Sequence, residues 1–209
     1  MVILKKILDF YINSSLHVAL SAFALVSMTQ YFFGVQGDFS VAFFAFFGTV
    51  VGYNFVKYDA IARLNKTEIK NELKTIVFLS FISLLACFYF FLQLSWMSKV
   101  SAFAFFGLTL LYTLPFFPNK QNARNWKGVK IYIVGITWVG VTVILPLVEA
   151  EIPFSMDVLL MAMQRFLLVF SIVLVFDIVD VKHDDIHLQT VPQKTGVELT
   201  KKLSYVLLF

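Results

Sequence analysis

The sequence predicts an all-α protein, a polytopic bundle of transmembrane helices that forms a single domain over residues 1–209. Two features predict it. Hydrophobic residues make up 59% of the 209 residues and charged residues only 14%, whereas soluble domains carry about 25% charged residues. The apolar residues also gather in runs of about 20, the length at which a helix crosses the hydrocarbon core of a bilayer.

The apolar runs give the order of the predicted spans. They lie at 11–33, 39–58, 76–94, 100–117, 131–148 and 158–179, and a further run begins at Leu203. That last run stops at Phe209, after about one and a half helical turns, so we expect the sequence to be part of a longer protein. Lys5 and Lys6 precede the first run as in a secretory signal peptide, but no small-residue cleavage site follows.

Charge predicts the orientation of these spans. With the N-terminus in the cytoplasm, all of the 17 lysine and arginine residues except Lys99 and Arg165 fall in cytoplasmic segments. The outer loops are acidic, with Asp38, Glu149, Glu151 and Asp157. Cytoplasmic loops of membrane proteins are enriched in Lys and Arg, so this charge distribution predicts a cytoplasmic N-terminus. We expect a multi-pass protein of the cell (inner) membrane. The net charge of +4 then reflects orientation, and no nucleic-acid or protein partner is expected.

Three aspartates at the end of the sixth run form the clearest candidate site. Asp177, Asp180 and Asp184 are spaced i, i+3 and i+7, which places them on one face of a helix. Stacked carboxylates repel each other unless a cation neutralises them, and Mg²⁺ prefers such oxygen ligands together with substrate phosphates. A solvated acidic helix end is the alternative, although Asp177 follows a long apolar run with no basic neighbour in sequence. The neighbouring His183 and His187 lack the spacing of a zinc site.

Two further clusters lie on the same predicted side of the membrane. Asn54 lies within the second run, where a buried amide needs a partner, and Lys57 and Arg63 follow it. After the fourth run, Tyr112 precedes a basic segment that includes Lys120 and Arg124. These cations can balance the charge of a diphosphate or can serve only topology and contact with anionic lipid.

The aspartate motif and the segment after it carry a resemblance to a known family. The three aspartates are followed by Thr190-Val191-Pro192-x-x-x-Gly196. This arrangement resembles the second aspartate-rich motif of the UbiA superfamily of intramembrane prenyltransferases. Asn54 resembles the Asn that opens the family's first motif, and Tyr112 with its basic loop resembles the stretch after the fourth helix. The agreement in order covers essentially the whole chain, which would be about the first two-thirds of a family member.

The resemblance implies a UbiA-like fold and transfer of a polyprenyl group from its diphosphate to a lipophilic or aromatic acceptor, such as a quinone or haem precursor. It implies Mg²⁺ as cofactor, held by Asp177, Asp180, Asp184, Asn54 and Asp59. It implies diphosphate contacts from Asn54, Lys57, Arg63 and Arg124. It implies catalytic roles for Asp180, Tyr112 and Lys120. In physical terms, the metal and the cations stabilise the leaving diphosphate.

The first family motif is altered in this chain. After Asn54, the expected aspartates are replaced by Phe55, Tyr58 and Ala62, and Asp59 comes one position late, about 100° around the helix. A non-catalytic relative that binds isoprenoid or acts as a scaffold is therefore the alternative. A transporter is a third possibility, but paired, broken helices of the kind that transporters show are not evident.

Overall fold

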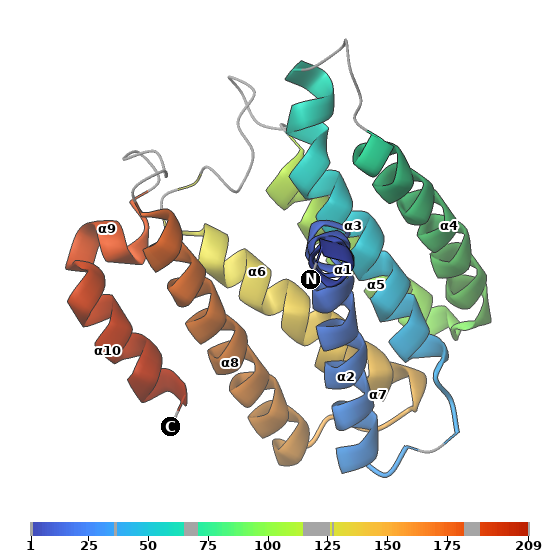
Figure 1. Cartoon of the computed structure of the whole chain (residues 1–209). Coiled ribbons are helices and arrows are strands. Elements are labelled where there is room, and N and C mark those ends of the chain that lie inside the picture. Colours follow the sequence, from blue (N-terminus) through green and yellow to red (C-terminus); the bar gives the residue numbers. More distant parts are fainter. Residues whose placement is uncertain are drawn as a thin grey trace. The chain divides into compact units, whose positions relative to one another are not determined.

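The structure is a computed structural model that describes residues 2–35, 37–64, 71–114, 126, 128–181 and 189–208 (Figure 1). Side chains are described for these residues except 2, 59–64 and 71–72. Within the described ranges every regular element is a helix, which confirms the all-α prediction. The chain divides into two compact units, Met1–Lys99 with Pro146–Glu151, and Val100–Leu145 with Ile152–Phe209.

The first unit is built on three helices that pack in sequence order. Helix α2 (Leu16–Phe32) packs on α3 (Ser40–Leu64), and α3 packs on α4 (Asn71–Gln93). Small buried residues such as Ala19, Ala22, Ala42 and Ala45 line these contacts and let the helix backbones approach closely. The short helix α1 (Val2–Asn13) precedes α2.

Helix α1 breaks away from α2 at Ser14 and Ser15. Ser15 has a φ of 61°, a left-handed conformation that interrupts a helix, and the two helix axes meet at 61°. The run predicted at 11–33 is therefore not one straight helix. Its straight part, α2, has 17 residues.

The second unit centres on α8 (Met156–Asp180), against which α6 (Lys130–Val139) and α10 (Val197–Leu208) pack. The five-residue helix α9 (Val191–Thr195) connects α8 to α10 and ends at Gly196, whose φ is 84°. In Figure 1 the orange α8 and the red α10 run antiparallel, so the turn around α9 lies beside the end of α8. Helix α5 (Trp96–Thr113) passes from the first unit into the second.

The helix after Lys130 changes its pitch along its length. It runs as α6, then a π-helical segment at Gly140–Ile144 (η3), then α7 (Leu145–Glu149). Pro146 lacks an N–H, and its ring would collide with the carbonyl of Thr142 four residues earlier in a regular α-helix. A wider π-helical turn relieves that collision, and such single turns often mark functional positions.

Among the described residues, four helical segments are long and apolar enough to cross a membrane: Ser40–Tyr58, Leu73–Gln93, Lys130–Glu149 and Met156–Asp180, with α1 and α2 as a fifth if that bent pair is one span. These four match the predicted runs at 39–58, 76–94, 131–148 and 158–179 within a few residues. Helix α5, at the predicted fourth run, is not among the spans found in the described residues. The predicted seventh run lies inside α10, which begins earlier, at Val197.

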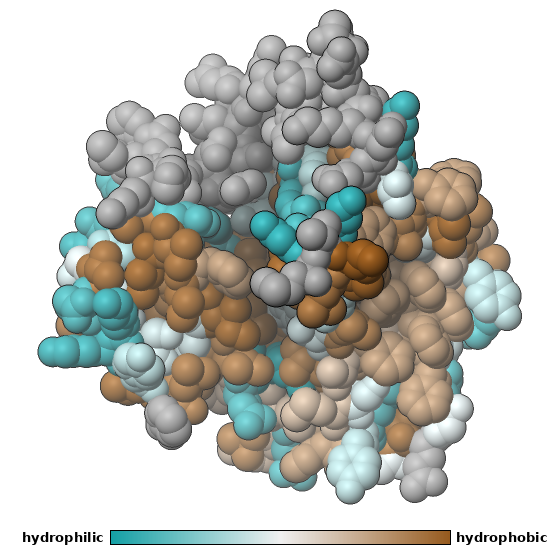
Figure 2. All heavy atoms as spheres, in the orientation of Figure 1, coloured by the Kyte–Doolittle hydropathy of each residue, from teal (hydrophilic) through white to brown (hydrophobic). Residues whose placement is uncertain are grey.

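Exposed hydrophobic side chains support a lipid environment for these helices. On α4, Phe78, Phe81 and Phe88 are 58–64% exposed, and Figure 2 shows hydrophobic residues over much of the face in view. Soluble monomers seldom expose contiguous apolar patches of more than a few hundred Å². Helices of this kind suit contact with lipid chains.

Candidate functional site

Asp177 forms a buried ion pair with Lys130. Asp177 lies near the end of α8 and is only 3% exposed, and its Oδ1 is 2.9 Å from Nζ of Lys130, the first residue of α6. A carboxylate buried in an apolar setting is costly unless a cation pairs with it. Lys130 supplies that cation from a position 47 residues earlier in the chain.

A small cavity adjoins this ion pair. Its described lining is made of Trp126, Gly128, Lys130, Ile131, Asp177, Thr190 and Val191, and its volume is about 20 Å³. A cavity of this size holds about one water molecule. The cavity nevertheless brings together an acid, a base and the start of the Thr-Val-Pro segment, three features that the sequence separates.

The Thr-Val-Pro segment starts a helix beside the ion pair. The side-chain Oε1 of Gln193 accepts a hydrogen bond from the backbone N–H of Thr190 at 2.9 Å, and Pro192 lies in the first turn of α9. Proline is favoured there because the first N–H groups of a helix have no partner within the helix. Thr190 and Pro192 are both buried. The motif therefore positions the chain where it turns back along α8.

The three motif aspartates do not share one environment. Asp177 is buried, whereas Asp180, the last residue of α8, is exposed. Asp184 lies outside the described residues. Within the part of the chain that the structure describes, no group of three His, Cys, Asp or Glu side chains is placed to hold a metal ion. The oxygen groups near the ion pair are the Asp177 carboxylate and the Thr190 hydroxyl, which are of the type that Mg²⁺ binds, and Lys130 already neutralises the carboxylate.

In the first unit, Asn54 is buried near the end of the apolar part of α3, with 3% exposure. Its Nδ2 donates to Ser80 Oγ on α4 at 2.9 Å, and Ser80 Oγ donates to the carbonyl of Ile76 at 2.8 Å. Its Oδ1 has no hydrogen-bond partner among the described residues. A buried acceptor without a partner costs about 1–3 kcal/mol, so this oxygen is suited to take a ligand.

Lys57 and Tyr58 are engaged with the end of α1. The carbonyl of Asn13 accepts hydrogen bonds from Tyr58 Oη at 2.8 Å and from Lys57 Nζ at 3.3 Å. Tyr58 is at a position where the resemblance to the UbiA superfamily would place an aspartate. In this chain that position holds the bend between α1 and α2 in place, and the predicted diphosphate contact of Lys57 stays a prediction.

Of the remaining predicted site residues, the structure describes the side chain of only one, Tyr112. Tyr112 is half-buried near the end of α5. The side chains of Asp59 and Arg63 on α3, together with Lys120 and Arg124, lie outside the described set. The described site residues thus fall into two groups, Asn54 and Lys57 in the first unit, and Tyr112, Asp177 and Asp180 in the second.

Arg165 is a buried cation to which the sequence assigned no role. It lies midway along α8 with 3% exposure, and its Nη1 donates to Thr142 Oγ1 in the π-helical segment at 2.8 Å. Ionisable residues inside membrane spans are functional candidates by default, and that rule was the signal available in the sequence.

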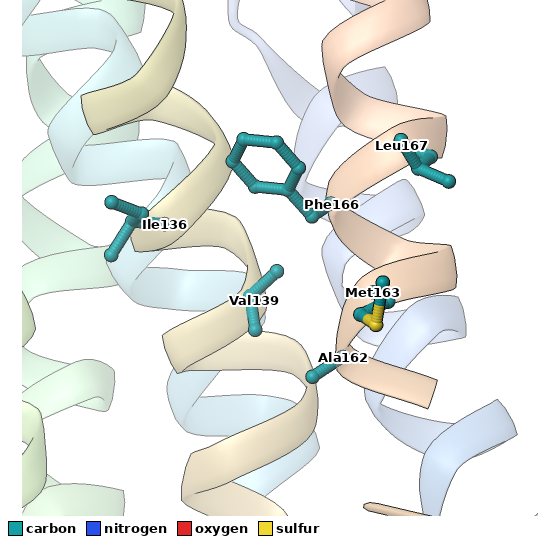
Figure 3. A pocket seen from close by; sticks show the side chains of 6 residues that line it. All are labelled: Ile136, Val139, Ala162, Met163, Phe166 and Leu167. Carbon is teal, nitrogen blue, oxygen red and sulfur yellow. The ribbon is translucent and has the colours of Figure 1, made fainter. Parts of the chain in front are cut away.

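An apolar groove runs between α6 and α8 (Figure 3). It has a volume of about 270 Å³ and is lined by Ile136, Val139, Ala162, Met163, Phe166 and Leu167. Ile136, Met163 and Leu167 are 37–55% exposed, so the groove is open. Figure 3 shows the ring of Phe166 reaching toward α6, where it lies over Gly135 so closely that a Cβ would be 2.6 Å from the ring.

No protein-family model, no curated protein and no solved structure matches this chain. The resemblance to the UbiA superfamily is therefore carried by the motif residues alone.

Proposed function

We propose that this chain is, or is part of, a UbiA-like membrane prenyltransferase that moves a polyprenyl group from its diphosphate to a lipophilic or aromatic acceptor. The observation that carries the proposal is the buried Asp177–Lys130 pair at the end of a membrane-length helix, with Thr190 of the family-like motif lining the same cavity. A carboxylate at that place can bind a metal ion, and an ammonium group can bind the oxygens of a diphosphate.

Mg²⁺ would be held by the aspartates of the motif, Asp177, Asp180 and Asp184. When bound, it would supply positive charge that stabilises the departing diphosphate. Lys130 balances the charge of Asp177 and donates hydrogen bonds. Lys120, Arg124 and Tyr112 are proposed to bind the diphosphate oxygens as the allylic C–O bond breaks and both bonding electrons leave with the diphosphate.

The groove between α6 and α8 supports a lipophilic substrate. Its six lining side chains carry no charge, so an isoprenoid chain can lie there without removing a polar group from water. The same proposal includes six complete membrane spans, an inner-membrane location and a cytoplasmic position for the aspartate motif.

A second candidate function is isoprenoid binding without transfer. It is favoured by the use of Tyr58 and Lys57 to hold α1, because the residue at a metal-ligand position of the family has a structural role here. Such a protein would bind prenyl lipid but would release no diphosphate.

The decisive experiment uses membranes that contain the protein, radiolabelled prenyl diphosphates of several lengths, and a mixture of quinone and haem precursors, with and without Mg²⁺. We expect labelled product and released diphosphate only with Mg²⁺. Asp177→Asn is expected to lower the rate by at least about 100-fold. Asp157→Asn, at the opposite end of the same helix, is the matched control. Binding of prenyl lipid with no diphosphate release, with or without Mg²⁺, would establish the second function instead.

A further inference from the structure

Helix α1 is strongly amphipathic. Ile3, Leu4, Ile7 and Leu8 recur at helical spacing and are 53–76% exposed, while Lys5, Lys6, Asp9 and Asn13 occupy the opposite arc. Apolar residues at i, i+3 and i+4 spacing form one stripe of a helix. This stripe has no cover among the described residues, although α1 is directly joined to α2.

The bend at the end of α1 is built into the unit. Ser14 and Ser15 are buried at 0% and 3% exposure, and Ser14 Oγ donates to the carbonyl of Phe10 at 2.7 Å. Tyr58 and Lys57 of α3 donate to the carbonyl of Asn13. A helix that breaks leaves its last carbonyls without N–H partners, and inside a membrane these must be satisfied by the protein. Tyr58 and Lys57 do so for the carbonyl of Asn13, whereas the carbonyl of Phe10 also accepts from the backbone N–H of Ser14. These contacts stabilise the bend.

The angle and the lengths place α1 at the edge of a bilayer. A helix at 61° to α2 lies in the membrane plane if α2 tilts by about 29° from the membrane normal, within the usual range of about 0–40°. Tilted by that angle, the 17 residues of α2 cross about 22 Å of the roughly 30 Å hydrocarbon core. If the Phe32 end of α2 reaches one headgroup boundary, the bend lies within about 8 Å of the other, the depth at which amphipathic helices bury their apolar face.

We infer that α1 is an interfacial helix that binds the surface of a lipid leaflet with anionic headgroups. Its apolar stripe enters the boundary between headgroups and acyl chains, and Lys5 and Lys6 on the other arc attract anionic lipid. Tyr58 and Lys57 connect this helix to the end of α3 that carries Asn54. The role rests on the membrane insertion proposed above, but it does not require prenyl transfer.

Spin labels test this placement in the whole chain. Single cysteines are introduced at each position from 3 to 12 in a Cys87→Ala background, labelled, and reconstituted in nanodiscs that contain anionic lipid. Collision rates with oxygen, which is enriched in lipid, and with a water-soluble nickel chelate are measured. A label at Phe81 on α4 is the control for insertion, because low oxygen collision there would show that membrane insertion itself fails.

We expect oxygen collision to peak at Ile3, Ile7 and Leu8, and nickel collision to peak at Lys5 and Asp9, with a period of about 3.6 residues. A depth that increases steadily along α1 would show a span and overturn the inference. Low collision with both reagents at the apolar positions would show a protein cover, such as a second copy, and would also overturn it. High nickel collision at every position would show that α1 lies in water and would overturn the inference as well.

The anionic preference has a separate test. The double variant Lys5→Gln/Lys6→Gln is expected to lower oxygen collision at Leu8 at least twofold in nanodiscs that mix anionic and zwitterionic lipid. Lys201→Gln/Lys202→Gln, an exposed lysine pair on α10, should have no effect at Leu8. Equal oxygen collision at Leu8 in purely zwitterionic and in mixed nanodiscs would overturn the proposed headgroup preference.

Discussion

Lys130 Nζ lies 2.9 Å from Asp177 Oδ1, although 47 residues separate the two in sequence. The pair joins the first residue of α6 to the last turn of α8. Because the Asp177 side chain is nearly inaccessible to bulk solvent, its carboxylate depends on Lys130 for charge neutralisation. The pair is thus both a packing constraint between two helices and the charged centre of the candidate site.

Removing one partner of this pair should destabilise the second unit. Lys130→Met leaves the Asp177 carboxylate buried without its cation, and we expect a loss of about 3 kcal/mol in the free energy of unfolding. The double variant Lys130→Met/Asp177→Leu should recover much of that loss. Reversible unfolding in mixed micelles measures both, with Lys74→Met, at an exposed position on α4, as control. Equal stability of Lys130→Met and the natural chain would contradict the buried pair.

Asp180 should matter for transfer and not for folding. Its side chain is exposed at the end of α8, so Asp180→Ala should change the free energy of unfolding by no more than about 0.5 kcal/mol. If the aspartates hold the metal and diphosphate, the same variant should lower prenyl transfer at least about 100-fold. Glu198→Ala, another exposed carboxylate in the second unit, is the control. Undiminished turnover by Asp180→Ala would remove this residue from the proposed site.

Close packing at Gly140 should be intolerant of a methyl group. A Cβ at this position would lie 2.2 Å from Cε1 of Phe105, so Gly140→Ala should cost about 1–3 kcal/mol in stability. Replacing the ring by the smaller leucine side chain should reduce that cost in the double variant Phe105→Leu/Gly140→Ala. Gly107→Ala on α5 meets nothing within 4 Å and should be neutral or stabilising. A destabilised Gly107→Ala together with a neutral Gly140→Ala would show that the ring does not pack there.

The hydrogen bond from Arg165 to Thr142 should be detectable by a double-mutant cycle. Thr142→Val removes the hydroxyl that accepts from Arg165 at 2.8 Å, and the expected cost is about 1.5–3 kcal/mol because the donor is charged. Thr142→Ser should retain most of the stability. Thr137→Val, the same substitution on α6, is the control, because the Thr137 hydroxyl is buried with no hydrogen-bond partner among the described residues. If Thr142→Val lowers the free energy of unfolding by the same amount in the natural chain and in the Arg165→Met background, the two residues are not coupled.

The helical spans were predictable because they depend on local composition. A run of about 20 apolar residues forms a helix in lipid whatever surrounds it, since only the helix satisfies every backbone group within the segment. The prediction for α8, at 158–179, therefore differs from the observed Met156–Asp180 by only a few residues. The break at Ser14–Ser15 was not predictable in this way, because it depends on donors from Tyr58 and Lys57 on another helix.

The candidate site was predictable in its residue types but not in its partners. The spacing of Asp177 and Asp180 placed both on one face of a helix, yet only Asp177 is buried. A helical face tells which residues lie together, whereas burial depends on the neighbouring helix that covers part of that face. Asn54 was expected to need a partner, and only the packing of α4 on α3 identifies that partner as Ser80.

The amino-acid sequence was sufficient to predict the all-helical class, four of the membrane-length segments and the position of Asp177 and Asp180 at the end of one of them. These are properties of apolar content and helical period, which act over a few turns. Three features are visible only in the folded chain: Lys130 neutralises Asp177, Tyr58 hydrogen-bonds to the end of α1 at its bend from α2, and Arg165 donates to Thr142 in the π-helical segment. Each of these depends on which helices pack together, and close packing rather than local propensity brings residues distant in sequence within hydrogen-bond range.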